Sequence, residues 1–202
     1  HSNYQSRMDK TATVLNYGQT PLVKSRFLDH ITKEENPCGE NAIVAVACYT
    51  GYNVEDAMLV NEGSLKRGMF RTSYFTTYES HEEISKEGDS VNEKKFANIA
   101  DNLSIVGTKP GYDYSKLDEY GIIKEGTIVD DKTALIGLVS VDSAPQGSVI
   151  EAEPRMVDGS KMPKKGQIGV VDRVFMTDDE DGKRIAKVRL LEQRIPTLGD
   201  KL

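Results

Sequence analysis

Two stretches of alternating apolar and polar residues near the end of the chain constrain the fold most. Residues 167–176 and 184–191 each alternate with a period of two, which is typical of half-buried β-strands. Between them lie four successive acidic residues and the pair Asp181-Gly182. Asp-Gly is favoured in tight turns that join antiparallel strands. The sequence therefore predicts a β-hairpin here.

The first half of the chain predicts further strands and one short helix. Residues 42–49 are apolar and rich in Val, Ile and Ala, which indicates a buried strand, and residues 56–60 continue as a second short strand. Asn61 is a suitable N-cap for a helix that runs through Leu65 and ends at Gly68. Residues 70–78 alternate aromatic and polar side chains, which again favours a strand.

The middle of the chain is less regular. Residues 81–95 are rich in Glu and Lys, which indicates either a helix or a mobile loop, and residues 107–121 are expected to be irregular. Residues 134–141 predict a strand, and residues 142–166, with three Pro, predict a long exposed loop. The predicted fold class is mainly β, a β-rich α+β chain with little helix.

Composition limits the kinds of protein this can be. The 202 residues suffice for one large domain or two small ones. The formal charge of −6 argues against a generic nucleic-acid coat, although a local basic groove stays possible. No apolar stretch reaches about 18 residues, so no membrane span or membrane partner is expected. The chain begins with His1 and shows no leader, so we expect an intracellular segment of a longer chain.

Cysteine usage predicts neither a zinc site nor a disulfide. Cys38 and Cys48 are the only two cysteines, and a structural zinc site needs four soft ligands in close pairs. Cys48 lies in the apolar run and is expected to be a buried small hydrophobic residue.

Three polar clusters are candidates for chemistry. Glu55 and Asp56 follow Gly51 and Asn53, a pattern that suits a tight turn presenting acids at a rim, although spacing alone favours a turn with merely solvated acids. Lys201 follows a Gly turn after the last strand and could face a phosphate. Lysines at 161, 164 and 165 lack the spacing of a phosphate-binding loop and are expected to be solvated.

Taken together and in order, several motifs resemble the second-largest (β-like) subunit of multisubunit DNA-directed RNA polymerases of the eukaryotic, archaeal or large-DNA-virus type. The family pattern N-A-I-V-A-I-A-x-Y-x-G-Y-N-Q-E-D-S is close to residues 41–57, with Val54 and Ala57 in place of the usual Gln and Ser. Further matches are Arg-Gly-Met-Phe-Arg at 67–71 and Ile-Pro-Thr-Leu-Gly-Asp-Lys at 195–201. The resemblance spans almost the whole chain.

The resemblance implies a division into three parts. Residues 1–78 would form the first part of the hybrid-binding region, which includes strands of a double-psi β-barrel. Residues 79–166 would be an inserted wall or flap β domain. Residues 167–202 would return into the barrel and stop after the Gly-Asp-Lys motif.

The resemblance also implies a role in nucleotidyl transfer. Asp56 and Glu55 would help receive the second, nucleotide-borne Mg²⁺, directly or through water, and Lys201 would bind a phosphate of the nucleic acid. The Mg²⁺ site would be shared with the largest subunit, and the isolated segment is expected to be inactive.

The implied partners are the largest subunit, other polymerase subunits, template DNA, nascent RNA and nucleoside triphosphates. The implied location is the nucleus in a eukaryote, or a cytoplasmic virus factory or virion for a virus. One alternative from another class stays open, namely a non-catalytic β-rich module for nucleic-acid binding or protein interaction. The acidic balance and the incomplete metal site motivate it.

Overall fold

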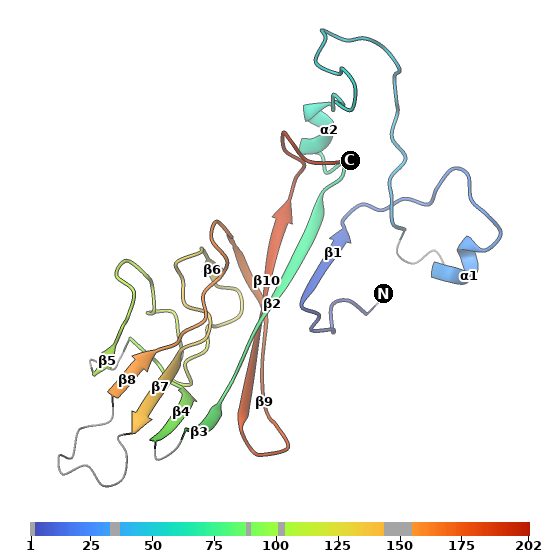
Figure 1. Ribbon diagram of the computed structural model, residues 1–202. Coiled ribbons are helices and arrows are strands. Elements are labelled where there is room, and N and C mark those ends of the chain that lie inside the picture. The colour runs from blue at the N-terminus through green and yellow to red at the C-terminus, as the bar shows by residue number, and fades with distance from the viewer. Residues whose placement is uncertain (1–2, 33–36, 88–89, 101–103, 144–154) are drawn as a thin grey trace, which may run out of the picture. The chain divides into compact units, whose positions relative to one another are not determined.

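Strands dominate the computed structural model, which describes residues 3–32, 37–87, 90–100, 104–143 and 155–202 (Figure 1). Ten strands form two five-stranded sheets, and the two helices in the described ranges have five residues each. The predicted fold class, mainly β with little helix, is confirmed. No helix within these ranges is both long enough and apolar enough to cross a membrane.

The first sheet contains the predicted hairpin. Its strand order is β1-β2-β10-β9-β6, with β1 at Thr11–Leu15, β2 at Thr72–His81, β10 at Arg184–Arg194, β9 at Gly169–Asp178 and β6 at Ile128–Val129. Strands β9 and β10 pair antiparallel from Asp178 opposite Arg184 onward. The amide of Asp179 donates to the carbonyl of Lys183 (2.7 Å), and Gly182 has φ +73°, as the turn requires. The predicted hairpin and the strand over 70–78 are both confirmed.

The second sheet corrects the prediction for residues 81–95. Its order is β3-β4-β7-β8-β5, with β3 at Glu83–Glu87, β4 at Ser90–Phe96, β7 at Leu138–Ser143, β8 at Arg155–Asp158 and β5 at Ile105–Val106. The expected helix or mobile loop is instead the antiparallel pair β3–β4. Opposite charges pair across these two strands, and Lys94 Nζ of β4 lies 2.7 Å from Glu83 Oε2 of β3. Strand β4 also pairs with β7, and such non-local pairing overrides local helix preference.

Two other boundaries differ from the sequence expectation. The strand predicted over 134–141 begins only at Leu138. Residues 134–136 are fully buried, but only Ile136 among them forms bridges, and these are isolated. The predicted loop over 142–166 contains β8, and residues 144–154 lie outside the described residues. The three-part domain division at residues 78 and 166 stays a prediction.

The chain divides into two compact units. Unit 1 comprises His1–Arg7, Ala12–Tyr74 and Gln193–Leu202, and unit 2 comprises Met8–Thr11 and Phe75–Glu192. Unit 2 holds the buried apolar cluster, in which Leu135, Ile136, Val188 and Leu190 are fully buried. Burial of such side chains contributes about 1.5–3 kcal/mol each, so this cluster is the main source of stability in unit 2.

A half-buried ion pair in unit 2 leads to a pH prediction. Arg184 Nη2 donates to Glu82 Oε1 (2.6 Å), and the amide of Phe96 donates to the same oxygen (3.0 Å). Burial raises the pKa of Glu82, but these hydrogen bonds and the Arg184 charge lower it more, so the pKa lies below the usual 4.5. A carboxyl group whose pKa falls on folding stabilises the fold above its unfolded pKa, and this stabilisation is lost as the pH falls through the folded pKa.

We therefore expect Glu82→Gln to lower the free energy of unfolding at pH 7 by about 1–2 kcal/mol. The difference from wild type should shrink as the pH falls below about 4.5, and urea unfolding at several pH values measures it. Glu119→Gln, at an exposed position, is the matched control. A constant difference across that pH range would contradict the assignment.

Candidate functional site

The segment that carries the acidic motif is fixed at both of its ends within unit 1. At its start, the amide of Leu22 donates to Asn41 Oδ1 (3.3 Å), and Asn41 Nδ2 donates to the carbonyl of Thr20 (3.0 Å). Helix α2 (Glu62–Lys66) follows its end, and the N-cap Asn61 accepts from the amide of Ser64 (2.9 Å). Gly68 has φ +112°. The predicted capped helix is therefore confirmed.

A second anchor was not visible in the sequence. The carboxylate of Glu40 accepts the amide of Phe70 with both oxygens, at 3.1 and 3.2 Å. Phe70 has φ +55°, a conformation that a non-glycine residue adopts only at a cost of about 1 kcal/mol or more. Glu40, directly before the motif segment, is thus connected to Phe70, four residues after the end of α2. No local signal identifies Glu40, because its partner is 30 positions away.

The apolar run at 42–49 is not a buried strand, and this prediction was wrong. Ile43 and Val46 are fully exposed, at 104% and 100%, and no strand is assigned to this run or to residues 56–60. Cys48 is exposed as well, contrary to the expectation of burial. An apolar run becomes a buried strand only where it finds a sheet edge and an apolar surface to cover it. The described residues offer this run neither.

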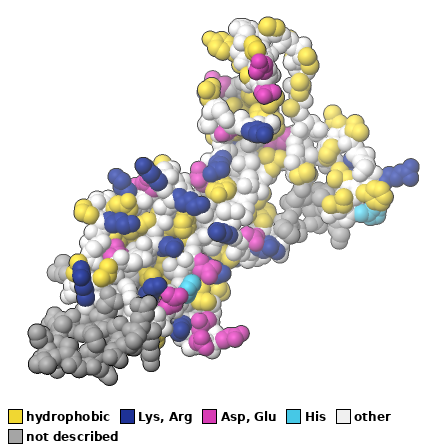
Figure 2. Space-filling model, viewed as in Figure 1, with side chains coloured by type: hydrophobic (Ala, Val, Ile, Leu, Met, Phe, Trp, Pro, Cys, Tyr) yellow, Lys and Arg dark blue, Asp and Glu magenta, His cyan; other side chains and the backbone are white. Residues whose placement is uncertain are grey.

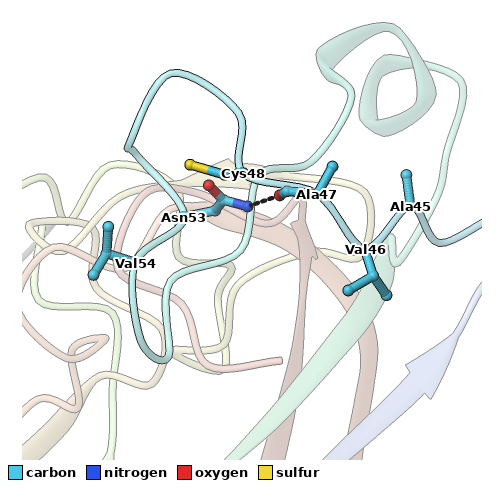
Figure 3. Close-up of a pocket in the computed structure, with 6 residues that line it drawn as sticks. All are labelled: Ala45, Val46, Ala47, Cys48, Asn53 and Val54. Atoms are coloured by element: carbon cyan, nitrogen blue, oxygen red, sulfur yellow. Dashed lines mark hydrogen bonds between the residues drawn. The ribbon is translucent and has the colours of Figure 1, made fainter.

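The motif itself folds into the expected tight turn (Figure 3). The Asn53 side chain closes it, because Asn53 Nδ2 donates to the carbonyl of Ala47 (2.7 Å) and Asn53 Oδ1 accepts from the amide of Tyr49 (3.2 Å). Thr50 and Gly51 both have positive φ, at 56° and 76°. A hollow of about 620 Å³ is lined by Ala45, Val46, Ala47, Cys48, Asn53 and Val54.

Glu55 and Asp56 lie exposed on the next part of this turn. Glu55 has φ 57°, and the amide of Ala57 donates to the carbonyl of Val54 (3.2 Å), so the two carboxylates follow each other on a local turn. Among the described residues, the structure records no hydrogen bond or ion pair for either carboxylate. Both are therefore available to a cation or a hydrogen-bond donor from outside this chain.

The acids alone do not complete a metal centre. Mg²⁺ prefers carboxylate and water oxygens in an octahedral arrangement, and Asp56 with Glu55 supplies that chemical type. However, no group of three or more His, Cys, Asp or Glu side chains positioned to hold a metal occurs among the described residues. The chemistry of these residues fits a shared metal site, at which the chain would supply one or two ligands.

Lys201 follows a second turn. The amide of Thr197 donates to Asp200 Oδ2 (2.9 Å), the amide of Asp200 donates to the carbonyl of Thr197 (3.1 Å), and Gly199 has φ +95°. Lys201 is exposed, and the described residues provide no recorded partner for its ammonium group. Asp56 and Lys201 both belong to unit 1. Their assignment as site residues, with Glu55, stays a prediction.

Two β-sheets with little helix define the class, namely a β-rich chain, which presents an acidic turn and a lysine turn whose charges have no recorded partner among the described residues. The family model described as RNA polymerase Rpb2, domain 6, matches residues 1–202. The chain therefore belongs to this family.

Similarity to curated proteins extends over the same length. The chain is 39% identical over 200 residues to DNA-directed RNA polymerase II subunit 2 of Arabidopsis thaliana, covering 99% of the chain and 16% of that protein. It is 37% identical over 201 residues to DNA-directed RNA polymerase subunit Rpo2 of Saccharolobus solfataricus, covering 99% and 17%. It is 36% identical over 201 residues to DNA-directed RNA polymerase II subunit RPB2 of Encephalitozoon cuniculi, covering 99% and 17%.

These matches confirm the resemblance to the second-largest polymerase subunit. The chain spans only 16 to 17% of the length of these relatives. The relatives are about six times longer than this chain, in which the apolar run at 42–49 is exposed.

Proposed function

We propose that the chain is part of the second-largest catalytic subunit of a DNA-directed RNA polymerase and contributes to the active centre, to RNA–DNA hybrid binding and to Mg²⁺-dependent nucleotidyl transfer. The observation that supports this most is the exposed Asp56 carboxylate on an ordered turn, within a chain that matches the polymerase family from end to end. The lysine on the second turn of the same unit supports it further.

The sign of the charge on Asp56 determines what it can bind. A carboxylate about 4 Å from a triphosphate oxygen is repelled by about 4 kcal/mol at an effective dielectric constant near 20. Asp56 can therefore face an incoming nucleotide only across a cation. When bound, Mg²⁺ neutralises phosphate charge and aligns the attacking and leaving oxygens. Asp56, with Glu55 beside it, holds or orients the nucleotide-borne ion, directly or through water.

Lys201 has the opposite role. Its ammonium group binds a phosphate of the RNA end or the hybrid, a charge-assisted contact of about 1.5–3 kcal/mol. The turn closed by Asp200 fixes the backbone from which the side chain extends. Lys201 thereby holds the transcript while the acidic turn receives the nucleotide.

The remaining parts of the site come from partners. The largest subunit supplies the other Mg²⁺ ligands, and further polymerase subunits, template DNA, nascent RNA and nucleoside triphosphates complete the assembly. The segment alone is inactive. It works where the DNA is, which is the nucleus in a eukaryote and the cytoplasm in an archaeon.

Replacing Lys201 by Gln tests the phosphate contact. In the assembled polymerase on a preformed RNA–DNA hybrid, the slope of log affinity against log salt concentration should fall by about 0.7–0.9, the value for one phosphate. Lys66→Gln is the control, because Lys66 is an exposed lysine of the same unit that already pairs with Glu62 (2.7 Å). If the Lys201 variant kept the wild-type salt slope, Lys201 would not contact a phosphate and would not belong to the site.

A further inference from the structure

Unit 2 contains a second basic feature that the proposed function does not use. We call residues 161–166 the lysine loop. Lys161, Lys164 and Lys165 are exposed, and no ion pair of their ammonium groups is recorded within the described part of the chain. By contrast, three other lysines of unit 2 have acidic partners at 2.7–2.9 Å, namely Lys94, Lys95 and Lys187. The lysine loop therefore presents charge that the described chain does not neutralise.

The backbone of the lysine loop is anchored to the buried core. The amide of Lys161 donates to the carbonyl of Ile136 (2.8 Å), and the amide of Leu135 donates to the carbonyl of Lys161 (2.9 Å). Leu135 and Ile136 are fully buried, and Pro163 within the loop is buried too. The first lysine of the loop is thus fixed to the interior of unit 2.

Two buried polar side chains hold the other end of the loop. Tyr78 Oη accepts from the amide of Lys164 (2.9 Å) and donates to Gln167 Oε1 (2.5 Å). The amide of Gln167 donates to the carbonyl of Lys164 (3.0 Å). Tyr78 and Gln167 are each only 9% exposed. Because buried polar groups must be paired, this network fixes the loop backbone, and binding a ligand would cost little backbone ordering.

The acids near the loop are engaged by groups of unit 2 itself. Asp131 Oδ2 accepts the amide of Gly166 (2.8 Å). Asp158 accepts the hydroxyl of Tyr114 (2.6 Å) and the amide of Ser160 (2.8 Å). These carboxylates accept hydrogen bonds from the loop backbone and from a tyrosine, and within the described ranges no ion pair joins them to the three ammonium groups. In Figure 2, Lys and Arg side chains lie over the loops around β6 on the face shown.

We propose that the lysine loop binds the phosphodiester backbone of nucleic acid in the assembled polymerase, without reading base sequence. Lysine is a flexible point charge, which suits phosphates and supplies affinity independent of sequence. The cores of protein–protein interfaces are instead depleted of Lys and enriched in aromatic residues, Met and Arg. In this loop Met162 is only half-buried and Pro163 is turned inward. The inference rests on the proposed function, because it assumes the polymerase assembly.

The test is a charge-neutralised triple variant of the assembled enzyme. Lys161→Gln, Lys164→Gln and Lys165→Gln are combined and compared with a control that combines Lys94→Gln, Lys95→Gln and Lys187→Gln. Both variants lose three positive charges, but the control lysines already have acidic partners. Retention of a preformed DNA–RNA scaffold is measured from 50 to 200 mM salt without nucleotides or chemistry, conditions that expose electrostatic contacts.

The lysine-loop variant should lower the salt slope by about 2–3, and the control should leave it at the wild-type value. Neutral methylphosphonate linkages, placed in the RNA, the template strand or the non-template strand in turn, identify which backbone is contacted. Neutral linkages in the contacted strand should abolish the difference in salt slope between the variant and wild type. Single Lys164→Gln and Lys165→Gln variants, each expected to lower the slope by about one, serve if the triple variant fails to assemble.

A wild-type slope in the triple variant, or in both single variants, would overturn the proposal. So would loss of a protein subunit from the complex with an unchanged slope, because that would identify an acidic protein as the partner. Failure of the proposed function can be told apart from failure of this proposal. It would appear as unchanged nucleotide addition by Asp56 variants, and it would not alter the scaffold retention measured for the lysine-loop variant.

Discussion

Asp56→Asn is expected to slow Mg²⁺-dependent nucleotide addition by the assembled polymerase about 10- to 100-fold, the range seen when a group that holds or orients a metal is removed. The substitution keeps the size and shape of the side chain but removes its charge. Because Asp56 is exposed and has no recorded partner among the described residues, the fold should be unaffected. The reduced rate therefore reports on cation binding, because the stability of the variant should equal that of the wild type.

Single-nucleotide addition measured against Mg²⁺ concentration separates the possible causes. The variant should need more Mg²⁺ to reach half its maximal rate, while its retention of a DNA–RNA scaffold stays at the wild-type level. Asp181→Asn, at the exposed tip of the β9–β10 hairpin, is the control and should match wild type. An unchanged Mg²⁺ requirement, or an equal loss of scaffold binding, would argue against the role given to Asp56.

Leu190→Ala should lower the free energy of unfolding by about 2–5 kcal/mol, the cost of removing a buried side chain and leaving a cavity. Leu190 is fully buried in the core of unit 2. A register shift between Arg189 and Leu190 interrupts the β9–β10 pairing, and both of these successive residues are buried. Arg189 forms an ion pair with Asp172, in which Arg189 Nη2 lies 2.6 Å from Asp172 Oδ2. A cavity at Leu190 thus also disturbs the packing around a buried charge.

Urea unfolding of the 202-residue chain measures this effect. Leu22→Ala makes the same chemical change at a side chain that is 89% exposed, so it should alter the free energy of unfolding by less than about 0.5 kcal/mol. If the two variants lost similar stability, the core would not lie where the structure places it.

The elements predicted correctly are those that local signals specify. The β9–β10 hairpin follows from alternation and an Asp-Gly turn, and α2 follows from Asn61 as its cap and a glycine at its end. Each of these signals lies within about a dozen residues of the structure that it determines. Reasoning from sequence succeeds there because no distant partner decides the outcome.

The failures share one physical cause, which is dependence on distant partners. Residues 83–96 contain good helix formers, yet β4 pairs with β7, more than 40 positions away. Residues 42–49 have the composition of a buried strand but meet no sheet edge among the described residues. Composition shows that the run can be buried, and only the surrounding polypeptide determines whether it is.

The candidate site shows the same division. The turns that present Asp56 and Lys201 were predictable from Gly and Asn positions, whereas their roles came from the resemblance to the polymerase family. The contact of Glu40 with the amide of Phe70, four residues after the end of α2, could not be predicted, because an acid's contact with a remote amide leaves no pattern in the sequence.

Local cleavage by iron tests most directly whether the two turns serve one nucleotide site. Fe²⁺ in place of Mg²⁺ in the assembled polymerase reduces added hydrogen peroxide to hydroxide and a hydroxyl radical, which cuts only nearby backbone, and ascorbate returns the Fe³⁺ to Fe²⁺. We expect cuts at residues 55–57 and at residues 199–202, both dependent on a bound nucleoside triphosphate and both reduced by Asp56→Asn. Cuts at one turn without the other, or cuts that do not depend on nucleotide, would contradict the shared site.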